Sequence, residues 1–135
     1  MNQPPGSENY GMAAKVVDAS IVAAWCFREA RAADAAALLK DYEWHAPSLL
    51  AYELTSIARR KSIAYPKQAE AIREALRTVF AIPIHWNEVD HLDALRLALD
   101  ASITTYDASY LYLSRKLGIP LATFDERLAQ AASAG

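Results

Sequence analysis

Short runs of β-branched and other apolar residues alternate along this chain with longer segments whose apolar residues recur at helical spacing. Strands that are separated by helices commonly pair in parallel, so this alternation predicts a mainly parallel sheet with helices on both faces. The chain has 135 residues, which is the length of one ordinary domain. We therefore expect a single α/β domain of three layers, α/β/α, around a central sheet of short strands.

The expected elements follow from this periodicity and from the positions of glycine and proline. Gly118 followed by Pro120 is a typical helix ending. The expected strands cover residues 15–18, 44–46, 82–86, 104–106 and 121–123. The expected helices cover residues 20–27, 29–41, 48–61, 66–80, about 88–99, 107–117 and 125–132. Residues 1–11 lack apolar periodicity and are interpreted as a disordered arm or an added leader, which leaves 12–135 as the domain.

Charge and composition argue against several classes of protein. The formal net charge is −2, so the chain lacks the overall basic excess of many nucleic-acid-binding proteins. No apolar stretch is long enough to span a bilayer, and no secretory signal is evident. Cys26 is the single cysteine, which excludes an internal disulfide, and its neighbours Trp25 and Phe27 favour a buried, inert thiol. We expect a cytoplasmic protein that does not bind membranes.

The run Val-Val-Asp-Ala-Ser places a carboxylate, Asp18, and a hydroxyl, Ser20, directly after the first expected strand. In an open α/β sheet, ligands bind at the carboxyl ends of the strands. Asp18 therefore occupies a position suited to chemistry, with Ser20 as a supporting group. Both residue types are also favoured helix caps, so this position alone leaves capping open as the explanation.

Glu53 lies where an acid is least expected. Within the helix 48–61, Leu50 and Leu54 mark the core-facing stripe, and helical spacing places Glu53 on it. Acids are seldom buried unless they are paired or bind a ligand. The alternatives are a side chain that reaches water at the edge of the stripe, or an ion pair with one of the arginines at 59 and 60.

Two further acids, Asp107 and Asp125, each follow an expected strand and precede an expected helix. Capping would explain both positions. Thr123 with Glu126 three residues later fits a capping box, so Asp125 ranks last of the four acids. Other acids on the expected surface helix or in its trailing loop should only be solvated; these are Asp90, Asp93 and Asp100.

The four acids predict a metal ion if they meet at one edge of the sheet. Two carboxylates about 5 Å apart repel by roughly 3 kcal/mol at an effective dielectric constant of about 20, so such a cluster needs a cation or protons. Oxygen ligands select hard ions, Mg²⁺ or Mn²⁺ rather than zinc. A carboxylate-held Mg²⁺ favours phosphate oxygens, which indicates phosphoryl chemistry. The expected metal ligands and catalytic residues are Asp18, Glu53, Asp107 and Asp125.

Four short motifs occur in order: Val-Val-Asp-Ala-Ser from residue 16, Tyr-Glu-Leu from 52, Tyr-Asp-Ala-Ser-Tyr-Leu from 106 and Leu-Ala-Thr-Phe-Asp-Glu-Arg-Leu from 121. Their order and spacing resemble the PIN-domain ribonucleases, most closely the VapC toxins of bacterial toxin–antitoxin pairs. The resemblance spans residues 15 to about 132. It implies a PIN-like fold and assigns the four acids to the family's acidic quartet, with Thr123 as a supporting residue beside the last acid.

The resemblance also implies a Mg²⁺-dependent endoribonuclease, active with Mn²⁺ as well, that cuts RNA as a homodimer and is inhibited by a VapB-type antitoxin. The apolar segment 21–25 and the helices between 48 and 81 predict a groove for this partner, which would push a basic side chain toward the acids. Basic residues around the turn between those helices are candidates for contacts with the RNA backbone, although a solvated helix end would explain them equally well. They are Arg59, Arg60, Lys61, Lys67 and Arg73.

An alternative function belongs to a different class, a catalytically silent PIN-like or receiver-like module that binds Mg²⁺ and acts through protein partners. Receiver domains carry paired acids at the first strand, whereas this chain has only Asp18 there and a glutamate inside a helix. The three histidines are scattered along the sequence and are expected to be structural or to face solvent, which disfavours a nuclease built on paired histidines. They are His45, His85 and His91.

Overall fold

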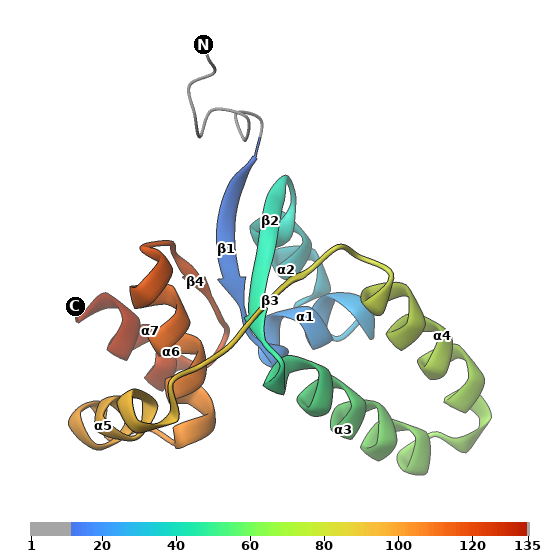
Figure 1. Ribbon diagram of the computed structural model, residues 1–135. Coiled ribbons are helices and arrows are strands. Elements are labelled where there is room, and N and C mark those ends of the chain that lie inside the picture. The colour runs from blue at the N-terminus through green and yellow to red at the C-terminus, as the bar shows by residue number, and fades with distance from the viewer. Residues whose placement is uncertain (1–11, 135) are drawn as a thin grey trace.

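The computed structural model describes residues 12–134, so the arm predicted at 1–11 lies outside the described residues. Its centre is a sheet of four strands, all parallel, in the order β3-β2-β1-β4 (Figure 1). The strands are β1 (Ala13–Val17), β2 (Tyr42–Pro47), β3 (His85–Asn87) and β4 (Leu121–Ala122). The prediction of a sheet of short, parallel strands is confirmed.

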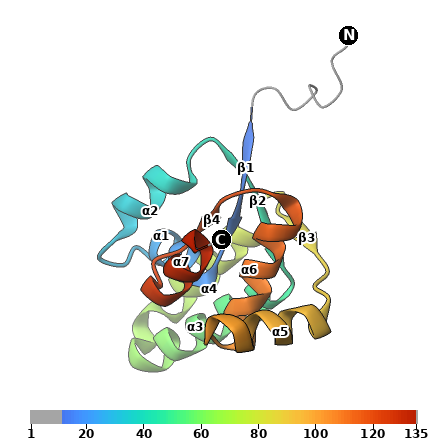
Figure 2. The ribbon, with the colours of Figure 1, turned by 90° about the vertical axis from the view of Figure 1, so that its left-hand side faces the viewer.

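Helices cover both faces of this sheet, which gives the three-layer α/β/α fold predicted above. The helices α5, α6 and α7 lie on one side and α1 to α4 on the other (Figure 1 and Figure 2). Their bounds are α1 (Ala19–Cys26), α2 (Ala32–Leu39), α3 (Leu49–Ala64), α4 (Ala69–Phe80), α5 (His91–Ala101), α6 (Thr105–Leu117) and α7 (Glu126–Ser133), with a short 3-10 helix at Pro66–Gln68. Among the described residues, none of these helices combines the length and apolarity needed to cross a membrane.

The hydrophobic core explains why β1 occupies the middle of the sheet. Val16 and Val17 are fully buried because their side chains point to opposite faces and a helical layer covers each face. On one face Trp44 of β2 packs edge-on against Trp25 of α1. On the other face Leu111 and other side chains of α6 complete the core. A strand buried on both faces presents its end, and not its sides, to a ligand.

The strand predicted at residues 104–106 is wrong. Thr104 is instead the N-cap of α6, because its hydroxyl accepts a hydrogen bond from the backbone N–H of Asp107 at 3.0 Å. Asp107 therefore lies in the first turn of a helix. The end of α6 agrees with the prediction: Gly118 follows the last helical residue with a positive φ of 67°, a conformation that glycine adopts without strain.

Other boundaries differ from the prediction by a few residues. The helix predicted at 29–41 is shorter in the structure, where α2 runs from Ala32 to Leu39 after a turn in which Arg28 has a positive φ of 55°. Pro47 ends strand β2 and does not begin the next helix, for which Ser48 is the N-cap. The third strand is displaced from 82–86 to β3. The exact ends of these helices and strands depend on contacts between distant segments, which the local residue propensities do not encode.

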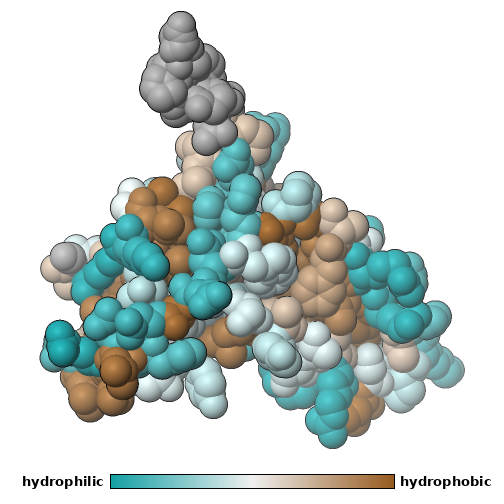
Figure 3. Space-filling view, viewed as in Figure 1, coloured by the Kyte–Doolittle hydropathy of each residue, from teal (hydrophilic) through white to brown (hydrophobic). Residues whose placement is uncertain are grey.

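Helix α5 keeps three leucines on its outer face. Leu92 and Leu99 are 79% and 72% exposed, and Leu95 between them is 48% exposed. Apolar surface is visible in this part of the molecule at the lower left of the space-filling view (Figure 3). Leucines three and four positions apart form one continuous stripe on a helix. This stripe is the outer face of the layer formed by α5, α6 and α7.

Candidate functional site

Asp18 follows the last residue of β1 and is the N-cap of α1. Its Oδ1 accepts hydrogen bonds from the Ile21 backbone N–H at 3.2 Å and from the Ser20 hydroxyl at 2.7 Å. Its Oδ2 accepts one from the Thr123 hydroxyl at 2.5 Å. Asp18 is only 4% exposed to solvent. Asp18 is thus a helix cap and, at the same time, a buried carboxylate at the carboxyl end of a central strand.

Ser20 and Thr123 join the two strand ends on which this carboxylate sits. The Ser20 Oγ accepts a hydrogen bond from the Phe124 backbone N–H at 2.9 Å, and the Thr123 Oγ1 accepts one from the Asp125 N–H at 2.9 Å. Both hydroxyls donate hydrogen bonds to the carboxylate of Asp18. The capping box predicted for Thr123 is therefore wrong. Asp125 itself caps α7, accepting a hydrogen bond from the Leu128 N–H at 2.9 Å.

Glu53 of α3 accepts a hydrogen bond from the hydroxyl of Tyr110 of α6 at 2.5 Å. Tyr110 is almost completely buried, and Glu53 is half-buried beside the fully buried Leu50 and Leu54, as the stripe predicted. Among the described residues Glu53 forms no ion pair, so the pairing with Arg59 or Arg60 considered above does not occur. The sequence reasoning missed Tyr110. The available signal was its position one turn after Asp107 on the same helix.

Neighbouring acids contribute to the raised pKa values of Asp18 and Glu53, so their charges interact. Burial is the main cause of the raised pKa of Asp18, hydrogen bonds from Ser20 and Thr123 oppose it, and repulsion by Asp107 adds to it. Burial also raises the pKa of Glu53; the bond from Tyr110 opposes this shift, and the charges of Asp18 and Asp107 strengthen it. Residues from α3, α6 and the end of β1 therefore interact electrostatically.

Asp107 links the fourth acid to this group. Burial raises its pKa, repulsion by Asp125 adds to the rise, and the Thr104 hydrogen bond and the charge of Arg127 oppose it. All four predicted acids thus belong to one chain of repulsive interactions, with Asp125 at its outer end. The four come from four separate segments of the chain: the end of β1, α3, the first turn of α6 and the cap of α7.

The chemistry of this acidic quartet suits a hard divalent ion. All of its donor atoms are carboxylate oxygens. Desolvation and repulsion raise the pKa values of Asp18, Glu53 and Asp107, and a nearby cation would relieve both effects. Among the described residues, no three of these carboxylates bring oxygens within 4.8 Å of one another. Mg²⁺ is usually bound through one or two carboxylates together with waters and phosphate oxygens, so a spread set of acids fits that ion.

A hollow of about 520 Å³ adjoins the quartet at Ser20. Of the five basic residues predicted to contact RNA, Arg60 and Lys61 line this hollow, whereas Arg59, Lys67 and Arg73 do not. Lys61 is paired with Glu29 at 2.8 Å. A basic residue that the prediction missed, Arg31, also lines it, with its guanidinium over the ring of Phe124 at 3.7 Å from the centroid. Basic side chains therefore line a hollow that reaches Ser20, although the net charge of the whole chain is −2.

The groove predicted between segment 21–25 and the helices of residues 48–81 is found in part, since Ala23 and Ala24 line the first hollow and Trp25 lines a second one. Ile21 and Val22 are fully buried in the core and cannot contact a partner, because α1 is the central helix of its layer. A second hollow, of about 830 Å³, is lined instead by residues at the end of α1 and by α4, including Trp25, Phe27 and Ile72. Cys26 lines it as well, and burial raises the pKa of its thiol to about 12, so the thiol is un-ionised at neutral pH, as predicted.

The histidines are scattered in the sequence, but two of them lie together in the structure, contrary to the prediction. His45 of β2 and His85 of β3 are paired across the sheet, and their rings stack with centroids 4.5 Å apart. The third, His91, begins α5. The sequence could not show the pairing, because 40 residues separate the two histidines and only the strand register joins them.

Comparisons with known proteins agree with this architecture. The model of the PIN domain family matches residues 15–134. Ribonuclease VapC3 from Pyrobaculum aerophilum is 34% identical over 120 residues, which cover 85% of this chain and 92% of that protein. Ribonuclease VapC1 from Mycobacterium tuberculosis is 34% identical over 118 residues, covering 86% and 89% respectively. The crystal structure of PAE2754 from Pyrobaculum aerophilum shares the fold, with a TM-score of 0.73 and 22% identity over 93% of this chain and 85% of that one.

Proposed function

Because this chain belongs to the PIN domain family and, within that family, to the VapC-type ribonucleases, we propose that it is a metal-dependent endoribonuclease toxin that hydrolyses RNA phosphodiester bonds. The observation that carries the proposal is the electrostatic coupling of Asp18, Glu53 and Asp107 at the end of the central strand. A bound divalent ion would relieve this repulsion, and the similarity to VapC ribonucleases favours catalysis over a silent Mg²⁺-binding module.

Asp18, Glu53 and Asp107 would surround the ion and bind it directly or through water, and Asp125 would act from the outer end of the site. Bound there, Mg²⁺ or Mn²⁺ supplies an activated water and stabilises the leaving oxygen. The neighbouring residues orient the ligands. Ser20 and Thr123 fix both oxygens of Asp18, and the Tyr110 hydroxyl fixes one oxygen of Glu53. These hydrogen bonds favour the ionised forms of the two acids, which are the forms that bind a cation.

The hollow beside the quartet supports RNA as the substrate. Arg31, Arg60 and Lys61 line it and can contact phosphates on the nucleotides that flank the cut. The ring of Phe124, which already stacks with Arg31, offers a surface for a base. The remaining candidates, Arg59, Lys67 and Arg73, would contact RNA only beyond this hollow.

Two protein partners complete the proposal. A VapB-type antitoxin would lay apolar side chains along the second hollow, which shares Glu29 and Lys61 with the first, and would bring a cation toward Asp18 and Glu53. A second copy of the chain would form a homodimer and cover exposed apolar surface, for which the leucine stripe of α5 is the best candidate. The protein would act in the cytoplasm on cellular RNA.

The test of the function removes one metal ligand at a time. Asp18→Asn and Asp107→Asn should each lower the rate of Mn²⁺-dependent RNA cleavage on the order of 100-fold or more, because several kcal/mol of transition-state stabilisation depend on the ion. Glu53→Gln should behave in the same way, whereas Asp125→Asn should keep partial activity because, among the other three acids, Asp125 affects the pKa of Asp107 alone. The rate is measured on a labelled RNA pool with each variant's folding checked by circular dichroism.

Asp100→Asn, which changes an exposed acid on α5, is the matched control and should cleave at the wild-type rate. Wild-type cleavage by a folded Asp18→Asn variant would refute the assignment of the site. Equal losses in all four variants would refute only the lower rank of Asp125. Sequencing the 5′ ends of cellular RNAs after brief induction of the chain would then identify the RNA that is cut.

A further inference from the structure

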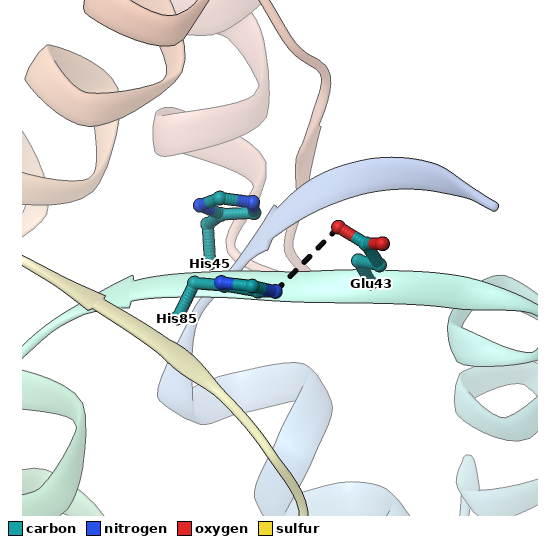
Figure 4. Close-up of side chains that lie close together, drawn as sticks. All are labelled: Glu43, His45 and His85. Atoms are coloured by element: carbon teal, nitrogen blue, oxygen red, sulfur yellow. Dashed lines mark ion pairs between the residues drawn. The ribbon is translucent and has the colours of Figure 1, made fainter. Parts of the chain in front are cut away.

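A second group of metal-binding side chains lies on the sheet, at the edge formed by β2 and β3. His45 and His85 occupy paired positions on these neighbouring strands, and Glu43 lies two residues before His45, on the same face of β2. One ligand atom from each of the three residues lies within 4.8 Å of the others. Figure 4 shows the two rings one above the other, beside the carboxylate of Glu43.

The donor atoms are already close to the spacing that a metal requires. Zinc binds nitrogen and oxygen at about 2.0–2.2 Å, so two ligands of a tetrahedral ion lie about 3.4 Å apart. The His85 Nε2 and the Glu43 Oε1 are 3.5 Å apart. The rings of His45 and His85 lie within 14° of parallel. His45 therefore has to tilt for its nitrogen to approach the donor atoms of His85 and Glu43. A partly exposed edge of the sheet allows such a movement without repacking the core.

Asn87 holds the ring of His45 in place. Its amide nitrogen lies 3.3 Å from the His45 Nδ1 and also donates a hydrogen bond to the carbonyl of His85 at 2.8 Å. The Nδ1 atom is therefore occupied, and Nε2 is the nitrogen left for an ion. Metal binding at Nε2 would place the proton on Nδ1; the Asn87 amide would then turn its oxygen toward Nδ1 to accept the proton's hydrogen bond and would give up its bond to the His85 carbonyl.

We propose that Glu43, His45 and His85 form a binding site for Zn²⁺ that is separate from the acidic quartet. Two imidazoles and one carboxylate are a donor set that zinc takes readily, whereas the all-carboxylate quartet suits Mg²⁺ and Mn²⁺. Three protein ligands leave one position for water on the exposed side. The ion would join β3, a strand of three residues at the edge of the sheet, to its neighbour β2.

Calorimetric titration of the full chain, without a polyhistidine tag, with ZnCl₂ tests the proposal. The wild-type chain should bind one Zn²⁺, and His45→Gln and His85→Gln should each weaken binding by at least about tenfold, because each removes a ligand. His91→Gln is the matched control and should bind as the wild type does, since His91 lies outside the group. Zinc should raise the melting temperature of the wild type and of His91→Gln, but not of His85→Gln.

Two further measurements separate this site from the proposed ribonuclease site. Asp107→Asn should bind Zn²⁺ as the wild type does, and excess Mg²⁺ should not displace the ion. RNA cleavage with Mn²⁺ should be unchanged in His85→Gln. Should a histidine variant fail to fold, Glu43→Gln, which keeps the shape of a partly exposed side chain, takes its place. Undiminished zinc binding by the folded histidine and Glu43 variants, or loss of binding in Asp107→Asn, would overturn the proposal.

Discussion

The geometry of Asp18 allows one residue to cap a helix and also to serve in the proposed metal site. A cap needs a carboxylate oxygen at the start of a helix, and a metal site needs one at the end of a strand. Asp18 meets both needs because β1 passes directly into α1, so that one oxygen accepts the Ile21 N–H while the other faces Thr123. Asp125 likewise caps α7 and still repels Asp107. A favourable capping position is therefore weak evidence against a functional role.

The first prediction at this scale concerns Tyr110→Phe. The change removes the hydroxyl that holds Glu53 and preserves the buried ring. The rate of RNA cleavage should fall roughly 10- to 100-fold, because that is the usual effect of losing a residue that orients a metal ligand. The concentration of Mn²⁺ that gives half-maximal activity should rise. Tyr112→Phe, on the same helix, is the control and should leave both quantities unchanged. Identical Mn²⁺ curves for the two variants would show that Tyr110 only fills space.

The second prediction is that Asp18→Asn stabilises the chain in buffer without divalent ions at neutral pH. Burial raises the pKa of Asp18, so its ionised form opposes folding when the pH is above that pKa, and a neutral amide of the same size removes this penalty. The midpoint of urea unfolding should increase, while that of Asp100→Asn should not. A lower midpoint for Asp18→Asn would mean that the hydrogen bonds from Ser20 and Thr123 outweigh desolvation.

At the scale of elements, the sequence predicted best where a local signal determines the structure. Gly118 and Pro120 marked the end of α6 because a left-handed residue and a proline are incompatible with a continuing helix. The beginning of α6 was mispredicted, since three residues rich in threonine have high strand propensity while only the Thr104 cap reveals the helix. Without a neighbouring strand to pair with, that propensity is not realised.

Thr104→Ala tests this cap and its effect on the site. Loss of the hydrogen bond to the Asp107 N–H should lower the free energy of unfolding by about 1 kcal/mol. The same hydroxyl lowers the pKa of Asp107, so without it that pKa rises further, and the acidic limb of the pH–rate profile should move to higher pH. Thr104→Ser keeps the hydroxyl and should restore both properties. An unshifted profile in a folded Thr104→Ala variant would disconnect the cap from catalysis.

At the scale of the whole molecule, the four acids were identifiable individually, but their assembly was not. Asp18 and Glu53 stood out because an acid at a strand end or on an apolar stripe is unusual. The contact between Tyr110 and Glu53 joins residues 57 positions apart, and the pairing of His45 with His85 depends on strand register. Such contacts follow from topology, which one sequence constrains only through residue patterns. The local basic border of the site was likewise hidden by a net charge of −2.

Arg60→Gln tests whether this basic border binds RNA. Removing one phosphate contact should weaken binding and reduce the slope of log affinity against log salt by about 0.7 for single-stranded RNA. Arg96→Gln removes the same charge from an exposed position on α5, away from the hollow, and should change neither quantity. Fluorescence anisotropy with a catalytically inactive Asp107→Asn background measures both. Equal slopes for the two arginine variants would show that the effect of Arg60 is only one of overall charge.

The placement of Thr123 beside Asp18 also sets the order in which this site can form during synthesis. The hydrogen bond between them spans 105 positions, and β1 gains its outer neighbour β4 only there. A ribosome therefore makes Asp18 and Glu53 long before the segment that completes their surroundings. Long-range parallel pairing is also slow to form. We expect a growing chain to be harmless to the RNA that encodes it and to its ribosome, because the site matures only after the C-terminal segment has left the exit tunnel.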